Sequence, residues 1–243
     1  MTISSMAREE PRTSGARPGL LDRLWIHLVW FAGGAGLGFA TPYIFTGILD
    51  LQHDWYYLVY FAVTLGFLSA YAGVMQIDVP EFFQRSWKWS VVIGIPVSAF
   101  LVLGVLSRDA TDGPEGPYAV FEVVWRGLAY GVVDALFLTA FPGAVAFALL
   151  RRDLAGIGRR LLFALVALPL VLVITGVYHL GYEQFRDDGI GGPEFGNAII
   201  SIPMLATANP IGSVVAHASM HITADIHVYE TDLYLPPQTE APK

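Results

Sequence analysis

The amino-acid sequence predicts an all-α fold, namely a transmembrane helix bundle of about seven spans with a cytoplasmic N-terminus. Of its 243 residues 54% are hydrophobic and only 14% are charged, whereas a soluble domain carries about 25% charged residues. Apolar runs without charges recur along the chain, and several reach the roughly 20 residues that a helix needs to cross a bilayer. These observations predict an integral membrane protein whose first partner is the lipid bilayer.

The spans follow from the apolar runs taken in order. Five are predicted at 24–49, 55–77, 90–107, 118–140 and 161–182. The last apolar tract, 195–228, contains Asn209-Pro210, a pair that interrupts helices. We therefore expect two short helices there, 195–208 and 211–228, which gives seven spans; one long broken helix, giving six, is the alternative.

The chain also divides by polarity. Residues 1–20 are polar and are predicted to be a disordered tail. Residues 21–228 are predicted to form a single transmembrane domain, and residues 229–243 to form a polar C-terminal tail.

Basic residues gather on one side of the predicted topology, and cytoplasmic loops are the ones enriched in Lys and Arg. Ten of the fourteen basic residues lie there: Arg8, Arg12, Arg17, Arg23, Arg85, Lys88, Arg151, Arg152, Arg159 and Arg160. The opposite loops are acidic, at 50–54, 109–115 and 187–194. This pattern predicts a multi-pass protein of the cell membrane with its N-terminus in the cytoplasm.

Composition excludes several classes of function. The net charge of −7 argues against a nucleic-acid partner, and a chain with no cysteine has no disulfide, thiolate metal site or cysteine nucleophile. The sequence contains no GxGxxG, P-loop or HExxH motif, and no cofactor is predicted. The oligomeric state stays open.

Five ionisable residues nevertheless interrupt three apolar segments: Glu122, Arg126, His179, His221 and Asp225. Each charge at the centre of a bilayer costs at least about 2.5–3.5 kcal/mol, so such residues face a polar interior and are usually functional. The seven-span topology brings all five to the outer leaflet, which predicts one site there. A purely structural ion pair between Glu122 and Arg126, at i,i+4 on one helix, is the alternative.

Two further residues extend these rows. Asp134 continues the row from Arg126, and His217 precedes His221 by four residues on one helix face. A His-x3-His pair can bind zinc. Because the sequence does not place a third ligand, metal binding is left undecided.

Three patches in this order resemble the CPBP family of intramembrane peptidases, which includes CAAX prenyl protease 2 and bacteriocin-processing or self-immunity proteins. The family pattern Glu-Glu-x-x-x-Arg-Gly is matched at 121–127, with Glu122 and Arg126. Phe-x-x-x-His is matched at 175–179 by its histidine, and His-x-x-x-Asn/Asp is matched by His221 and Asp225. The likeness covers about 118–228 and includes a Gly-Ser pair at 212–213.

This resemblance implies hydrolysis of peptide bonds in membrane-associated substrates, with Glu122, Arg126, His179, His221 and Asp225 as the catalytic set. The family's first glutamate activates water, but Phe121 occupies that position here. Three outcomes are consistent with this change. Glu122 acts as the base, Asp134 substitutes for it, or the chain is an inactive member that binds peptides as an immunity or scaffolding protein. A metal or proton transporter using the same residues is a further class, disfavoured because no internal repeat is evident.

Overall fold

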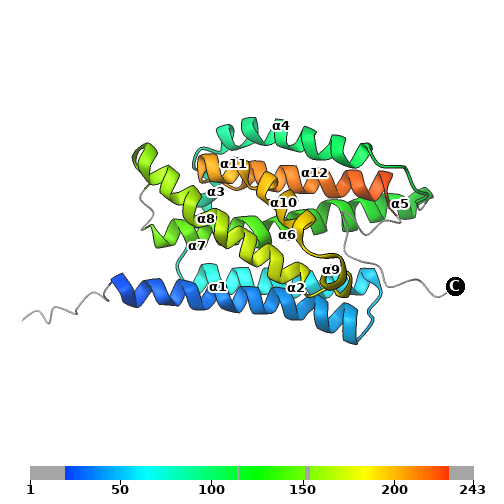
Figure 1. Ribbon diagram of the computed structural model, residues 1–243, viewed down its shortest axis with the longest axis horizontal. Helices are drawn as coiled ribbons and strands as arrows, with labels where there is room; N and C mark the ends of the chain where they lie inside the picture. Colours follow the sequence, from blue (N-terminus) through cyan, green and yellow to red (C-terminus); the bar gives the residue numbers. More distant parts are fainter. Residues whose placement is uncertain (1–19, 114, 151–153, 230–243) are drawn as a thin grey trace, which may run out of the picture.

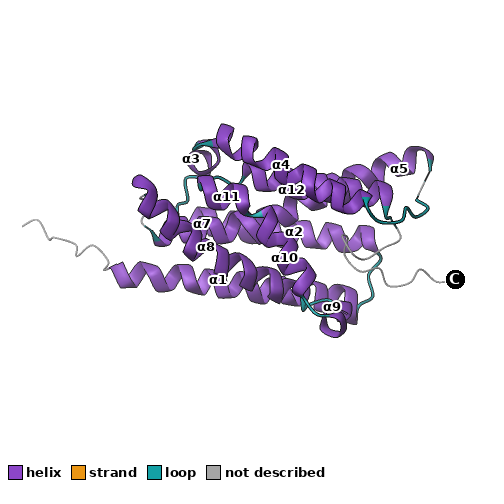
Figure 2. Cartoon of the chain, turned by 45° about the horizontal axis from the view of Figure 1, so that its top comes forward, coloured by secondary structure: helices purple, strands orange, loops and turns teal. Residues whose placement is uncertain are grey.

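The structure is a computed structural model that describes residues 20–113, 115–150 and 154–229. All regular elements in these ranges are helices, so the all-α prediction is confirmed (Figure 2). Most of both predicted tails, and Arg151 and Arg152 of the basic set, lie outside the described residues.

Five helical segments are long and apolar enough to cross a membrane: Trp25–Ile48, His53–Val74, Trp87–Leu106, Gly116–Leu149 and Gly156–His179. The first comprises most of α1 (Leu20–Pro42) with η1 (Tyr43–Ile48), and the next two are α2 (His53–Val74) and α4 (Trp87–Leu106). The fifth is α8 (Gly156–His179). Shorter helices are α3 (Val79–Gln84), α9 (Glu183–Asp188), α10 (Gly191–Ile200), α11 (Ile202–Thr207) and α12 (Ile211–His227).

The segment Gly116–Leu149 is the central helix of the bundle. It runs without interruption through α5 (Gly116–Glu122), η2 (Val123–Ala129), α6 (Tyr130–Ala135), η3 (Leu136–Ala140) and α7 (Phe141–Leu149). Its most apolar stretch is 78% buried, against 28–39% in the other four segments. In Figure 1, α4 and α12 lie along one side of it and α1 and α2 along the other. It is longer than the predicted span 118–140, because Pro142 enters the first turn of α7, where proline is tolerated, and does not end the helix.

The final apolar tract breaks at Asn209-Pro210, as predicted. Ala208 adopts a left-handed conformation with φ of 53°, and α12 starts immediately after Pro210. The part before the break is itself divided into α10 and α11, which run back toward the start of α12 (Figure 1).

Hydrogen bonds fix the direction of α12. At its start, the Asn209 side-chain amide donates to the carbonyls of Phe82 and Phe83, at 3.2 and 2.7 Å. At its end, the Thr111 N–H donates to the carbonyl of His227, at 3.0 Å. Helix α12 therefore runs from the end of the bundle with the basic α3–α4 connection to the end with the acidic loop 109–115, antiparallel to the central helix.

Candidate functional site

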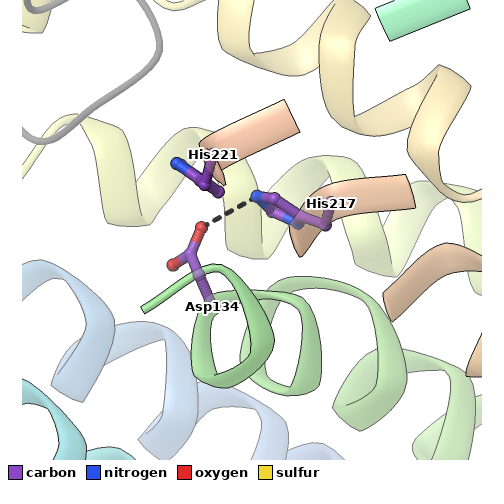
Figure 3. A group of neighbouring side chains, drawn as sticks. All are labelled: Asp134, His217 and His221. Atoms are coloured by element: carbon purple, nitrogen blue, oxygen red, sulfur yellow. Dashed lines mark ion pairs between the residues drawn. The ribbon is translucent and has the colours of Figure 1, made fainter. Parts of the chain in front are cut away.

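Three buried side chains meet where the central helix crosses α12. Asp134 projects from α6 toward His217 and His221 of α12 (Figure 3). Their exposed fractions are 2%, 3% and 4%, and one ligand atom of each lies within 4.8 Å of the others. The signal available in sequence was the i,i+4 histidine pair; the carboxylate that completes it comes from a helix about 80 residues away.

The two oxygens of Asp134 have different partners. The Tyr60 hydroxyl donates to Oδ1 at 2.6 Å, and His217 Nε2 lies 3.2 Å from Oδ2. Tyr60 comes from α2 and is fully buried. Sequence analysis missed Tyr60, since a tyrosine inside an apolar run carries no signal that distinguishes it from a core residue.

The ring nitrogens of His217 and His221 have fewer hydrogen-bond partners than the oxygens of Asp134. The His217 and His221 rings stack with centroids 4.8 Å apart, and the Tyr130 ring stands edge-on to His221 at 5.0 Å. Nδ1 of His217 and both ring nitrogens of His221 are buried without a hydrogen-bond partner among the described residues. A buried polar atom left unpaired costs about 1–3 kcal/mol, so such an arrangement in a native site calls for an explanation.

A cavity of about 380 Å³ adjoins this group, and its lining residues include one carboxylate, three histidines and one arginine: Asp134, His179, His217, His221 and Arg108. His179, at the end of α8, has Nδ1 2.8 Å from the carbonyl oxygen of Thr175. Because a carbonyl can only accept, Nδ1 carries the proton, and Nε2 of the neutral ring retains its lone pair. The cavity lining therefore combines a carboxylate and three imidazoles with the Arg108 side chain.

The same cavity has an apolar side that reaches the surface. Phe100 of α4 and Phe195 of α10 line it and are 58% and 67% exposed. Both belong to outward-facing parts of the bundle. The cavity thus approaches the protein surface between α4 and α10.

Tyrosine hydroxyls form another wall. Tyr130, Tyr178 and Tyr182 line the cavity, and their hydroxyls are linked in series at 2.8 and 2.7 Å. Tyr182 is linked in turn to Tyr56 at the start of α2, at 2.6 Å. Since each hydroxyl both donates and accepts, the series satisfies four buried hydroxyls without a charge.

The remaining three residues of the predicted set, Glu122, Arg126 and Asp225, lie in a separate cluster. Together with Tyr229 they form what we call the arginine cluster. Arg126 Nε lies 3.6 Å from Asp225 Oδ1, and Arg126 Nη2 donates to the Tyr229 carbonyl at 3.1 Å. The guanidinium also stacks on the Tyr229 ring at 4.3 Å. Burial raises the pKa of the Tyr229 hydroxyl above 10.0, so it stays neutral beside the Glu122 carboxyl.

The structure thus divides the five predicted residues into two groups. His179 and His221 line the cavity, whereas Glu122, Arg126 and Asp225 do not belong to its wall. The reason is helix geometry: Arg126 pairs with Asp225, and Asp134 pairs with His217. In each helix the two positions are eight residues, or about 12 Å, apart along the axis, and the helices are antiparallel.

The fold and the site together define a class: a helical protein with five segments long and apolar enough to cross a membrane and a buried carboxylate–histidine cavity. Comparison with models of known protein families, with curated proteins and with solved structures found no match to this chain.

Proposed function

We propose that the protein is a membrane-embedded hydrolase that cleaves peptide bonds of membrane-associated substrates in the Asp134/His179 cavity. The observation that carries this proposal is the convergence of Asp134, His179, His217 and His221 on one cavity inside an apolar bundle. Water activation requires such groups within hydrogen-bond reach of a shared volume. The resemblance of 118–228 to CPBP peptidases supports a peptide bond as the target.

The proposed chemistry gives different roles to the Asp134–His217–His221 group and to His179. The Asp134–His217–His221 group activates a water, whose oxygen adds to the carbonyl carbon of the peptide. The C–N bond then breaks, and the proton lost by the water passes to the leaving amine. His179, with its free Nε2 lone pair, is placed to carry that proton. Asp134 therefore takes the part that the family assigns to the glutamate at position 121.

Glu122 has a structural role under this proposal. It belongs to the arginine cluster, and Phe121 beside it is 45% exposed and lies outside the cavity wall. A glutamate at position 121 would not reach the cavity in this arrangement.

A cleavage assay tests the proposal. The full chain and its variants are reconstituted with membrane-anchored peptide reporters, and product is measured by mass spectrometry. Asp134→Asn and His179→Ala should each reduce cleavage about 10²–10⁴-fold, the range of a lost acid–base group. Glu122→Gln, which leaves the cavity intact, should retain cleavage, and Phe121→Glu should not increase it.

Equal cleavage by wild type and both cavity variants would contradict the proposal. Binding of the reporter without cleavage by wild type would favour the second candidate, an inactive peptide-binding family member. That candidate is suggested by one observation, the loss of the family glutamate at Phe121.

We further propose seven crossings of the cell membrane with the N-terminus in the cytoplasm. The direction of α12 supports this topology, since it carries Asp225 to the end of the bundle with the acidic loops. The pair α10–α11 then supplies the sixth crossing and α12 the seventh.

The topology is testable because the chain has no cysteine. Single cysteines at two exposed positions, Asp188→Cys in α9 and Gln84→Cys in α3, are expected to differ in intact cells. A membrane-impermeant maleimide should label position 188 and leave position 84 unlabelled until the cells are opened. Labelling of position 84 alone in intact cells would show that the protein has the opposite orientation.

A further inference from the structure

We propose that Asp134, His217 and His221 form a binding site for a first-row divalent cation of the zinc type. The inference deepens the proposed function, because such a cation would be the means by which this group activates water. Binding itself does not depend on cleavage, so the two can fail separately.

The first argument is the spacing of the donor atoms. Zinc bonds to imidazole nitrogen and carboxylate oxygen are about 2.0–2.2 Å long, so two ligands at a tetrahedral angle lie about 3.3 Å apart. His217 Nε2 and Asp134 Oδ2 are 3.2 Å apart, and the third ligand atom lies within 4.8 Å of both.

In the described part of the chain, the ring nitrogens of His221 are buried and lack hydrogen-bond partners, which also supports a bound cation. His221 is 96% buried, since its exposed fraction is 4%, and neither ring nitrogen has a hydrogen-bond partner among the described residues. A core histidine held for packing alone would be expected to place at least one nitrogen against a backbone carbonyl, as His179 does with Thr175. A cation bound by the group would give one of these His221 nitrogens a partner.

The third argument is the support around the group. Ligating carboxylates in metal sites are themselves hydrogen-bonded, which fixes their orientation. The Tyr60 hydroxyl supplies this bond at Oδ1 and leaves Oδ2 toward the histidines. Tyr60 is therefore a positioning residue for the site.

Donor chemistry narrows the cation. Two imidazoles and one carboxylate, with no thiolate in the chain, suit Zn²⁺ and its first-row neighbours rather than Cu⁺ or Ca²⁺. Three protein ligands leave a coordination position open, as in catalytic rather than structural zinc sites. All three ligand residues line the cavity that His179 also lines. A cation there lowers the pKa of a bound water and polarises a carbonyl oxygen.

The test uses the full chain, purified in detergent, freed of metal with a chelator and titrated with Co²⁺ as the probe. Three ligands define one site, so we expect about one Co²⁺ per chain and visible absorption bands of low-symmetry Co²⁺. Zn²⁺ should displace the band stoichiometrically. His217→Ala and His221→Ala should abolish the band, and Tyr60→Phe should weaken binding about 10–100-fold.

His227→Gln is the matched control, because this half-buried histidine lies on the same helix and its ring bonds the Arg108 carbonyl instead. It should bind Co²⁺ as wild type does. Helix content by circular dichroism identifies any variant that has not folded, and Tyr60→Phe keeps all three ligands if the alanine variants fail. No band in folded wild type, or an equal band in the ligand variants, would overturn the site.

The cleavage assay separates this inference from the proposed function. Stoichiometric Co²⁺ binding without cleavage would support the cation site and contradict the proposed hydrolase activity. Cleavage at full rate by chelator-treated protein that binds no Co²⁺ would contradict the cation site and support the proposed hydrolase activity.

Discussion

Replacing Arg126 with methionine is expected to destabilise the bundle by about 3–5 kcal/mol, the cost of removing one partner from a buried ion pair. The Arg126 and Asp225 side chains are 0% and 1% exposed. Without the guanidinium, the Asp225 carboxylate and its neighbour Glu122 remain in an apolar setting with like charge. The methionine fills a similar volume, so the loss reports charge rather than packing. Unfolding by SDS titration in mixed micelles measures the change.

The matched control is Arg85→Met. Arg85 also pairs with a carboxylate, Glu81 at 2.9 Å, but the two side chains are 33% and 43% exposed. An exposed pair of this kind contributes about 0–1 kcal/mol. Adding Asp225→Asn to Arg126→Met should restore part of the stability, since it removes one orphaned charge. Equal small losses for Arg126→Met and Arg85→Met would show that the arginine cluster is solvated.

The helical part of the fold could be predicted because charge-free apolar runs of span length are the sequence pattern of helices that can cross a bilayer. A chain in lipid must satisfy its backbone internally, so apolar runs of span length become helices. The break at Asn209-Pro210 was equally visible, because proline restricts the residue before it. The length of the central helix was not, because Pro142 can either end a helix or begin a new turn within one.

The site was only partly predictable, because the pairing of the helices decides which side chains lie at the same height in the bundle. His217, His221 and Asp225 share a face of α12, and the predicted topology and the family resemblance placed His221 and Asp225 in one site. Residues on one helix face lie at different heights, because the helix rises 1.5 Å per residue. The packing of the partner helix decides which of them come into contact. Arg126 meets Asp225, and Asp134 meets His217, so the row is shared between two clusters. Pairing between residues that lie 83 and 99 positions apart in the chain is not encoded in local spacing.

The turns of the central helix add to this difficulty. Residues 122, 126, 130 and 134 would drift around an α-helix by about 40° per step of four. The π-helical stretch η2 covers 123–129 and holds more residues per turn, which offsets part of the drift. Arg126 and Asp134 therefore both face α12. Hydrophobic patterning does not reveal such π-turns.

Replacing Gly212 with valine is expected to disrupt the contact on which the placement of α12 depends. A Cβ at Gly212 would overlap the Ser90 carbonyl oxygen, and a Cβ at Gly94 would lie 2.7 Å from the Gly212 Cα. The helices α4 and α12 thus meet backbone to backbone, as small residues allow in membranes. They cannot move apart freely, because the Ser90 hydroxyl donates to the Asn209 carbonyl and accepts from the Gly212 N–H, at 2.8 and 2.9 Å.

Two opposing effects decide the outcome of the smaller change, Gly212→Ala. Alanine gains up to about 1 kcal/mol of helix propensity over glycine, whereas overpacking costs about 1–3 kcal/mol and falls here on backbone atoms that cannot rotate away. We expect a net loss for alanine and a larger one for valine. Gly66→Ala, in the middle of α2 with no atom within 4 Å of its added Cβ, should be neutral or stabilising. Thermal unfolding in detergent gives the sign of each change. Because His217 follows Gly212 on α12, the valine variant should also lose Co²⁺ binding, and an unaltered melting temperature would refute the close contact between α4 and α12.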